Sequence, residues 1–202
     1  MTTHSVAYRH AHWDTPWWAN PNRTAGRYNR AMEASTQYWC LHPLGPLAEV
    51  LRWSGRASAE DAGTFRLRLW AAKVKRDDLV TINFENADRF GVSADELVGE
   101  DYAPTQELAD QFRKNGAPGF IAPSAALPGT DVLVLFGPRL SFPYLLDPVD
   151  PDDQVPTAHA AEATIATEIL PWVRWKGASH WALEEWRRSG AIAVWQEPPV
   201  LR

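Results

Sequence analysis

Residues 119–136 read G-F-I-A-P-S-A-A-L-P-G-T-D-V-L-V-L-F. Two apolar runs, at 119–122 and 132–136, are separated by Pro-Ser and Pro-Gly pairs, which favour turns. Short apolar runs between turn signals are typical of strands that are buried on both faces. We therefore predict two buried strands in this part of the chain.

Outward from this stretch, predicted strands and helices follow one another without a regular strand–helix–strand repeat. Residues 64–74 alternate apolar and polar side chains, which predicts a strand with one solvent-facing side. Residues 46–54 and 105–115 carry apolar residues at helical spacing, and a glycine follows each segment, as at helix ends. Further strands are predicted at 5–9, 37–41 and 79–82, and further helices at 86–91, 94–98 and 181–189. This order predicts an α+β fold.

The composition is that of an ordinary globular protein, with 45% hydrophobic and 22% charged residues in a chain of 202. The formal net charge of −5 argues against non-specific binding to nucleic acid, which needs a basic surface. Cys40 is the single cysteine, so an internal disulfide and a Cys-based zinc site are excluded. The sequence has neither a leader-like start nor an apolar run of ~18 residues. We therefore expect a cytoplasmic protein without a membrane span.

The composition changes after Pro143, where residues 147–153 read D-P-V-D-P-D-D. We expect residues 1–142 to form the main domain and residues 143–202 to form a C-terminal extension that packs on it. Residues 13–30 are rich in Trp, Pro, Asn and Gly, which predicts a long ordered loop. Long loops inside compact domains often carry function.

Four short pieces of the sequence carry candidate chemistry: Gly26-Arg27-Tyr28-Asn29, Tyr38, Glu49 and Ala122-Pro123-Ser124-Ala125. Each piece taken alone also has a purely structural explanation, as a surface charge, a core aromatic, a solvated helix flank and a turn. The usual motifs of nucleotide-triphosphate hydrolases, dinucleotide oxidoreductases, serine hydrolases and zinc proteases are absent from the sequence.

In their order and context these pieces resemble the RES-domain family, which is named after an Arg, a Glu and a Ser. The members of this family are toxins of RES–Xre toxin–antitoxin pairs. The matching pieces are Tyr8-Arg9, Gly26-Arg27-Tyr28-Asn29, Tyr38 with Ala48-Glu49, Pro104-Thr105-Gln106 with Leu108-Ala109, the run 119–125 and the strand 132–136. The resemblance covers residues 6–140. Residues 13–22 are richer in Trp than the family pattern, and the last third of the chain lies outside it.

The resemblance implies an ADP-ribosyltransferase-like fold, in which two small β-sheets flanked by helices form a cleft for NAD. It implies that residues 1–142 cleave the nicotinamide–ribose bond of NAD. NAD is then a substrate, inorganic phosphate is a candidate co-substrate, and no metal is expected. The implied partner is an Xre-type antitoxin that masks the cleft, in a homo-oligomer or a toxin–antitoxin hetero-oligomer, with no membrane or nucleic acid bound directly.

The resemblance also implies a catalytic set, Arg27, Tyr38, Glu49 and Ser124, and an NAD-binding set, Arg9, Arg27, Tyr28, Tyr38 and Ser124. Cleavage passes through an oxocarbenium-like state, whose positive charge the Glu49 carboxylate would offset. Arg27, with Arg9 as a second cation, would bind the pyrophosphate through paired donors. Tyr38 or Tyr28 would present an aromatic face to the cationic nicotinamide ring. Ser124 would bond the carboxamide or the ribose, or orient Glu49.

Three functions stay open at this point. The first is an NAD-degrading toxin that works by hydrolysis or phosphorolysis. The second is a protein ADP-ribosyltransferase, because it would use the same Arg, Tyr and Glu. The third is a non-catalytic module that binds NAD or a protein through its Trp-rich surface, against which the intact set of candidate residues argues. A toxin that acts on nucleic acid is disfavoured by the net charge.

Overall fold

The computed structural model describes residues 4–11, 21–137, 158–164 and 167–195. Most of the Trp-rich part of the predicted loop and the acidic link at 147–153 lie outside the described residues. The strands are β1 (His4–His10), β2 (Thr36–Cys40), β3 (Arg66–Lys75), β4 (Val80–Thr81), β5 (Gly119–Pro123), β6 (Asp131–Phe136) and β7 (Ala158–Thr164). The helices are α1 (Gly45–Ser54), α2 (Ala59–Gly63), η1 (Ala87–Phe90), α3 (Ala94–Val98), α4 (Ala103–Lys114), η2 (Thr167–Trp172) and α5 (Trp181–Ser189).

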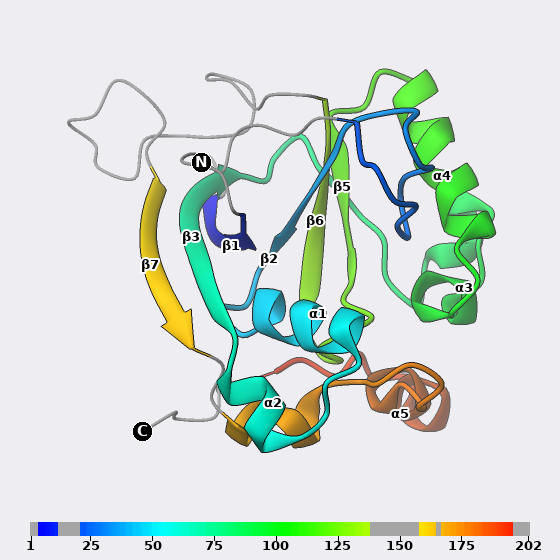
Figure 1. The fold of residues 1–202 in the computed structure, drawn as a ribbon. Coiled ribbons are helices and arrows are strands. Elements are labelled where there is room, and N and C mark those ends of the chain that lie inside the picture. The colour runs from blue at the N-terminus through cyan, green and yellow to red at the C-terminus, as the bar shows by residue number, and fades with distance from the viewer. Residues whose placement is uncertain (1–3, 12–20, 138–157, 165–166, 196–202) are drawn as a thin grey trace.

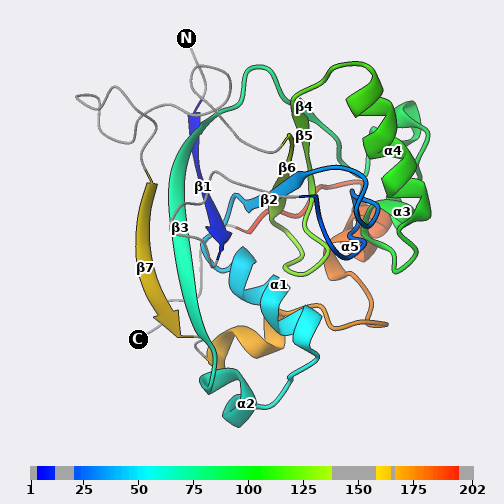
Figure 2. The same cartoon turned by 45° about the horizontal axis from the view of Figure 1, so that its top comes forward.

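The described strands form one mixed sheet of seven strands, in the order β4-β5-β6-β2-β1-β3-β7. All neighbours are antiparallel except β4 and β5, which are parallel. Helices lie around this sheet, with α1 across it, α3 and α4 beside β5, and α5 at one end (Figures 1 and 2). The α+β prediction is confirmed.

The expectation of two small sheets is corrected, because the described strands belong to a single sheet. The two halves of that sheet are joined weakly in the middle. β1 and β2 pair at one register position only, Tyr8 with Cys40, whereas β1 pairs with β3 at seven positions. The halves therefore diverge on either side of this junction, and α1 packs against both central strands there.

The two strands at 119–136 explain the core on both faces of the sheet. Both occur as predicted, and the register pairs Gly119 with Leu135 and Pro123 with Asp131. Because successive side chains of a strand point to opposite faces, Phe120 and Val134 join the cluster under α3, α4 and α5, while Ile121 joins the cluster on the opposite face. This stretch is a rigid wall on which a site can be built.

The segment 167–195 lies against the main body of the protein. Ile169 and Val173 are buried against the apolar face of α1, in one cluster with Leu47 and Leu51. Leu183 of α5 is buried in the cluster that contains β5. This part of the chain therefore reaches two of the three core clusters and comes close to the residues that α1 presents.

Candidate active site

Two adjoining pockets open where the two halves of the sheet diverge beneath α1. The larger has a volume of about 240 Å³ and is lined by Gly26, Arg27, Tyr28, Tyr38, Cys40, Glu49, Arg52, Trp53, Tyr102, Pro123, Ala125, Val132 and Lys176. The second is lined by Tyr8, Arg9, His10, Tyr38, Cys40, Pro46, Glu49, Val50 and Trp53. Four residues line both pockets, namely Tyr38, Cys40, Glu49 and Trp53. The pockets are thus two lobes of one cleft, which meet at Glu49.

Side chains of helix α4 hold the loop at 26–29 in place through hydrogen bonds to its backbone carbonyls. The Thr105 hydroxyl donates to the Arg27 carbonyl at 2.7 Å, and the Gln106 amide donates to the carbonyls of Gly26 and Asn29 at 2.9 and 3.0 Å. Arg113 donates to the carbonyl of Tyr28 at 2.6 Å. Thr105 and Gln106, the Thr-Gln pair at the start of this helix, therefore provide hydrogen-bond donors for the backbone carbonyls of the loop.

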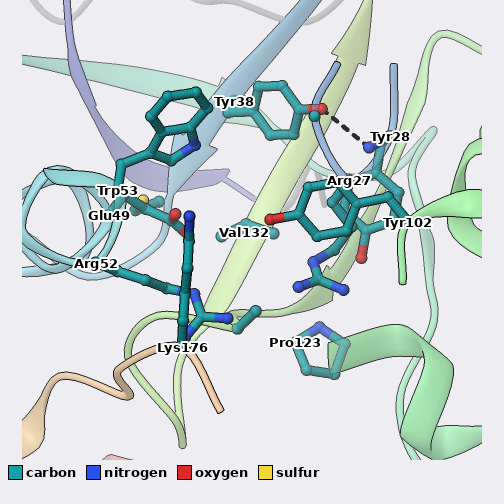
Figure 3. Close-up of a pocket in the computed structure, with 13 residues that line it drawn as sticks. Arg27, Tyr28, Tyr38, Glu49, Arg52, Trp53, Tyr102, Pro123, Val132 and Lys176 are labelled. Carbon is teal, nitrogen blue, oxygen red and sulfur yellow. Dashed lines mark hydrogen bonds between the residues drawn. The ribbon is translucent and has the colours of Figure 1, made fainter. Parts of the chain in front are cut away.

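Tyr38 fixes the same loop from the sheet. Its hydroxyl accepts from the backbone N–H of Tyr28 at 3.0 Å (Figure 3). The same hydroxyl donates to Oδ1 of Asn29 at 2.8 Å. A Cβ atom at Gly26 would lie 2.6 Å from Asn29 Oδ1 and 3.0 Å from Tyr38 Oη, so a larger residue here would have to displace the Asn29 side chain, which its hydrogen bonds hold in place. The hydroxyl of Tyr38 is thus used by the protein itself, while its ring lines both lobes.

The side chains of Arg27 and Tyr28 leave polar atoms unsatisfied in the larger lobe. The guanidinium of Arg27 lies over the ring of Tyr102, 4.9 Å from its centroid, and its Nη1 is buried without a hydrogen-bond partner. The Oη of Tyr28 is buried without a partner as well, and burial raises the pKa of this phenol to about 12. Buried polar groups are normally paired, so these two atoms are suited to a polar ligand.

Glu49 lies on the edge of α1 that faces the cleft. The helix forms because Pro46 occupies its first turn, Gly55 ends it in a left-handed conformation, and the apolar residues around Glu49 pack into the core. Burial raises the pKa of the Glu49 carboxyl, and the nearby charges of Arg27 and Arg52 oppose that shift. Within the described part of the chain the carboxylate has no hydrogen bond or ion pair of its own. It is available to a ligand.

Arg9 lines the second lobe from strand β1, on the other side of Glu49. Its Nη1 donates to Oε1 of Gln37 at 2.8 Å, and its guanidinium lies 5.9 Å from the centroid of the Trp39 ring. Burial lowers the pKa of Arg9 to about 10, so the group stays cationic at neutral pH. The structure thus brings Arg9, Arg27, Tyr28, Tyr38 and Glu49 together around one cleft.

Ser124 is not brought into the cleft. Its neighbours Pro123 and Ala125 line the larger lobe, but the Ser124 hydroxyl accepts from the backbone N–H of Leu127 at 3.1 Å. Its carbonyl accepts from Nε2 of His180 at 3.0 Å. The expected contact of Ser124 with substrate does not correspond to this geometry, in which Ser124 shapes the turn between β5 and β6.

Four lining residues were missed by the sequence reasoning: Arg52, Trp53, Tyr102 and Lys176. Trp53 lies one helical turn after Glu49, so helical spacing alone places it on the same face of α1. Arg52 adjoins it, and Tyr102 immediately precedes α4. Lys176 has no comparable signal, because its place in the cleft depends on how the segment 167–195 folds back.

Among the described residues, no group of three or more His, Cys, Asp or Glu side chains could hold a metal ion. In the same part of the chain, none of the helices has the length and apolar character that crossing a membrane requires.

Comparisons with known proteins give a consistent picture. Over 118 residues the chain is 30% identical to a Mycobacterium tuberculosis (strain H37Rv) protein named a probable NAD(+) phosphorylase; the match covers 58% of this chain and 56% of that protein. The matched stretch thus spans just over half of the relative. The crystal structure of the M. tuberculosis MbcT–MbcA toxin–antitoxin complex contains a chain with the same fold, with a TM-score of 0.64 and 18% identity over 85% of this chain and 89% of that one.

The family of this chain follows from a match between its sequence and a family model. A family model described as the RES domain matches residues 4–150, nearly three quarters of the chain. The matched range contains the loop at 26–29, Tyr38, Glu49 and Ser124, the pieces that carried the resemblance. The chain belongs to the RES-domain family.

Proposed function

We propose that this RES-domain protein cleaves the bond between nicotinamide and ribose in NAD, and that it is the toxin of a toxin–antitoxin pair. One observation carries the proposal: the unpaired Glu49 carboxylate lies where two lobes meet, and each lobe has an arginine, Arg27 in one and Arg9 in the other. A dinucleotide has two halves joined by a dianionic pyrophosphate. A two-lobed cleft with cations on both sides of a carboxylate suits such a molecule.

Binding would use the residues that the cleft leaves unsatisfied. Nη1 of Arg27 would donate to the pyrophosphate, with Arg9 as the second cation. Tyr28 and Tyr38 line the larger lobe with their rings stacked 6.3 Å apart, and an aromatic face of this kind suits the cationic nicotinamide ring. Ser124 would act indirectly, through the turn that places Pro123 and Ala125 in the wall.

The chemistry would depend on Glu49. As the glycosidic bond breaks, positive charge develops on the ribose, and a carboxylate beside it lowers the energy of that state. Burial raises the pKa of the Glu49 carboxyl, and the charges of Arg27 and Arg52 counteract this effect. Arg27, which would bind the pyrophosphate, therefore also favours the charged form of Glu49 that catalysis requires.

The relatives support the proposed function and favour one acceptor and one kind of partner. The mycobacterial relative is named a probable NAD(+) phosphorylase, which favours phosphate over water as the acceptor of the ADP-ribosyl group. The structural neighbour was solved as a toxin–antitoxin complex, which supports an antitoxin as the partner of this chain. We extend this to an Xre-type antitoxin that covers the cleft, and to action in the cytoplasm, where NAD is available.

Proton NMR of the purified protein with NAD, freed of antitoxin, tests the proposal. Release of free nicotinamide is the expected result. ADP-ribose 1″-phosphate formed at a phosphate-dependent rate would identify phosphorolysis, and plain ADP-ribose would identify hydrolysis. NAD that stays intact with and without phosphate would contradict cleavage, and transfer of label from biotin-NAD to a protein would then indicate ADP-ribosylation.

A further inference from the structure

Lys176 lines the larger lobe of the cleft, although it lies beyond residue 150, where the match to the family ends. We propose that its ammonium group binds inorganic phosphate as the acceptor of the ADP-ribosyl group. The inference rests on the proposed function, and it assigns the acceptor to a residue of the segment 167–195. Four observations carry it: how Lys176 is presented, what anchors that segment, which group its charge faces, and the charge of the lobe.

A tight turn presents Lys176 to the cleft. The N–H of Ala178 donates to the carbonyl of Trp175 at 3.0 Å, and Gly177 between them has φ of 79°, which favours glycine. Nε of Arg174 donates to the Ala178 carbonyl at 2.9 Å, which ties the turn to its own start. The backbone under Lys176 is therefore fixed, and its side chain extends toward Glu49 and Trp53 (Figure 3).

Glu100 and two arginines fasten this turn to the rest of the protein. Arg52 pairs with Glu100 at 2.6 Å and also donates to the carbonyl of Arg174. Arg174 lies 3.5 Å from the same carboxylate and donates to the carbonyl of Val98 at 2.7 Å. Glu100 is thus engaged by two cations, and burial of Arg52 and Arg174 strengthens these contacts.

The ammonium of Lys176 faces an aromatic ring. Its Nζ lies 5.7 Å from the centroid of the Trp53 ring, which is itself 59% exposed at the mouth of the cleft. An aromatic face orients a cation without neutralising its charge. Arg27 is held in the same manner by Tyr102 on the opposite wall. The lobe thus has two cations, each oriented by an aromatic ring, whose charge can interact with a ligand.

The charges of the larger lobe favour two anionic groups. Its charged lining residues are Arg27, Arg52, Lys176 and Glu49, three cations and one acid. Arg52 is already paired with Glu100, so Arg27 and Lys176 are the two cations that this lobe offers to anionic groups. The whole chain has a formal charge of −5, so this lobe departs from the rest of the protein. In the proposed function Arg27 is assigned to the pyrophosphate. Lys176, on the Glu49 side of the lobe, is the cation that remains for a second phosphate.

The reaction balances with phosphate as acceptor. An oxygen of hydrogen phosphate forms a bond to C1″ of the ribose while the bond from C1″ to N1 of nicotinamide breaks. The electron pair of that bond stays on N1, which becomes neutral. The products are nicotinamide and ADP-ribose 1″-phosphate, and the proton of the phosphate stays where it is. The step as written needs neither an oxidant nor a reductant.

Kinetics of three variants test the assignment: Lys176→Gln, Lys176→Arg and, as a control, Lys114→Gln. Lys114 is an exposed lysine at the end of α4 that lines neither lobe, so the control removes the same charge elsewhere. We expect Lys176→Gln to raise the KM for phosphate by about 10-fold or more, the effect of one lost charge-assisted hydrogen bond. The KM for NAD should change far less, and Lys176→Arg should restore much of the phosphate affinity.

The pyrophosphate of NAD offers Lys176 the same chemistry, and the two KM values separate these sources. A rise in the KM for NAD with an unchanged KM for phosphate would overturn the proposal, as would two unchanged values. Calorimetric titration with inorganic phosphate alone gives a second readout: wild type and Lys114→Gln should bind it at least about 10-fold more tightly than Lys176→Gln. Equal binding overturns the assignment even if the wild-type protein fails to cleave NAD, so the two proposals fail separately.

Discussion

At the scale of single residues, the cleft contains groups that lower the stability of the fold. The Glu49 carboxyl has a pKa above its usual value because it is buried beside the pockets. The folded protein therefore holds the proton more tightly than the unfolded chain does. As pH rises past the usual range of a glutamate, ionisation of Glu49 lowers the free energy of unfolding. A residue that costs stability and lines a cleft is typical of a functional site.

Glu49→Gln should therefore separate activity from stability. We expect turnover of NAD to fall by about 10²–10³, the usual cost of losing one electrostatic stabiliser of a transition state. The unfolding midpoint should equal or exceed that of the wild type at pH 7, because no charge is buried. Initial rates and thermal unfolding measure the two effects. Glu107→Gln, on the exposed side of α4, is the matched control and should change neither.

Two results would contradict the role of Glu49. One is a Glu49→Gln protein that cleaves NAD at the wild-type rate. The other is a variant that is inactive because it has unfolded, which would make Glu49 a structural residue.

Arg27→Gln should weaken the binding of NAD without disturbing the loop. The backbone carbonyl of Arg27 is held by Thr105, so the loop keeps its shape when the side chain changes. We expect the KM for NAD to rise by about 10-fold or more, since a paired donor to phosphate is lost. Steady-state kinetics against NAD measure this, with the exposed Arg23→Gln as control. An unchanged KM would remove Arg27 from the phosphate-binding role.

At the scale of elements, most helices and strands lie where the sequence predicts them, whereas the way the strands pair into one sheet was not predicted. The strands at 119–136 and helix α5 occur where the apolar runs and glycine caps predict them. The predicted strand at 79–82 shortens to the two residues of β4, and the predicted helix at 86–91 is a single 3₁₀ turn, η1. The short α2, η2 and β7 were not predicted, because short elements and Ala-rich strands give little periodic signal.

The candidate site shows the same division. The loop at 26–29, Tyr38 and Glu49 come together as the motifs predict, because α4 and β2 hold the loop beside α1. The departure of Ser124 could not be predicted, since it depends on a hydrogen bond within the turn after β5. Lys176 could not be predicted either, because its position requires a chain that returns from beyond residue 166 to α1.

Helix α5 should give the protein a pH-dependent stability through His180. Nδ1 of His180 accepts from the backbone N–H of Leu183 at 3.2 Å and caps the helix, while Nε2 donates to the Ser124 carbonyl. Burial lowers the pKa of this imidazole to about 4, from the ordinary histidine value of 6.5. The unfolded chain therefore binds the proton more tightly, and stability is lost as pH falls from 6.5 toward 4.

Urea unfolding of wild type and His180→Asn between pH 7 and pH 4 measures this effect. Asparagine also caps helices but does not titrate in this range. The stability advantage of the wild type over the variant should shrink by on the order of 3 kcal/mol as pH falls. A difference that stays constant with pH would show that His180 does not carry the pH dependence.

At the scale of the whole molecule, the cleft forms where the sheet is least tightly paired, between β1 and β2. β1 and β2 share one pair, so the halves separate, and α1 spans the gap with Glu49 and Trp53 directed into it. The segment 167–195 then closes the larger lobe with Lys176, while its own core residues pack against α1 and against the cluster that contains β5. Helix α1 and the segment 167–195 therefore serve two purposes: one face of each lines the cleft, and another packs into the core.

This architecture predicts a toxin whose effect in cells depends on one carboxylate. Expression of the wild-type chain alone should arrest growth and lower cellular NAD within the first generations, because the proposed cleavage of NAD needs no second protein. Glu49→Gln, accumulated to the same level and folded to the same extent, should do neither. Growth and extracted NAD measured in parallel provide the readout, and co-expression of the cognate antitoxin should restore both for the wild type. Growth arrest by Glu49→Gln with NAD unchanged would mean that the chain acts by binding a partner, and the cleft would then need another explanation.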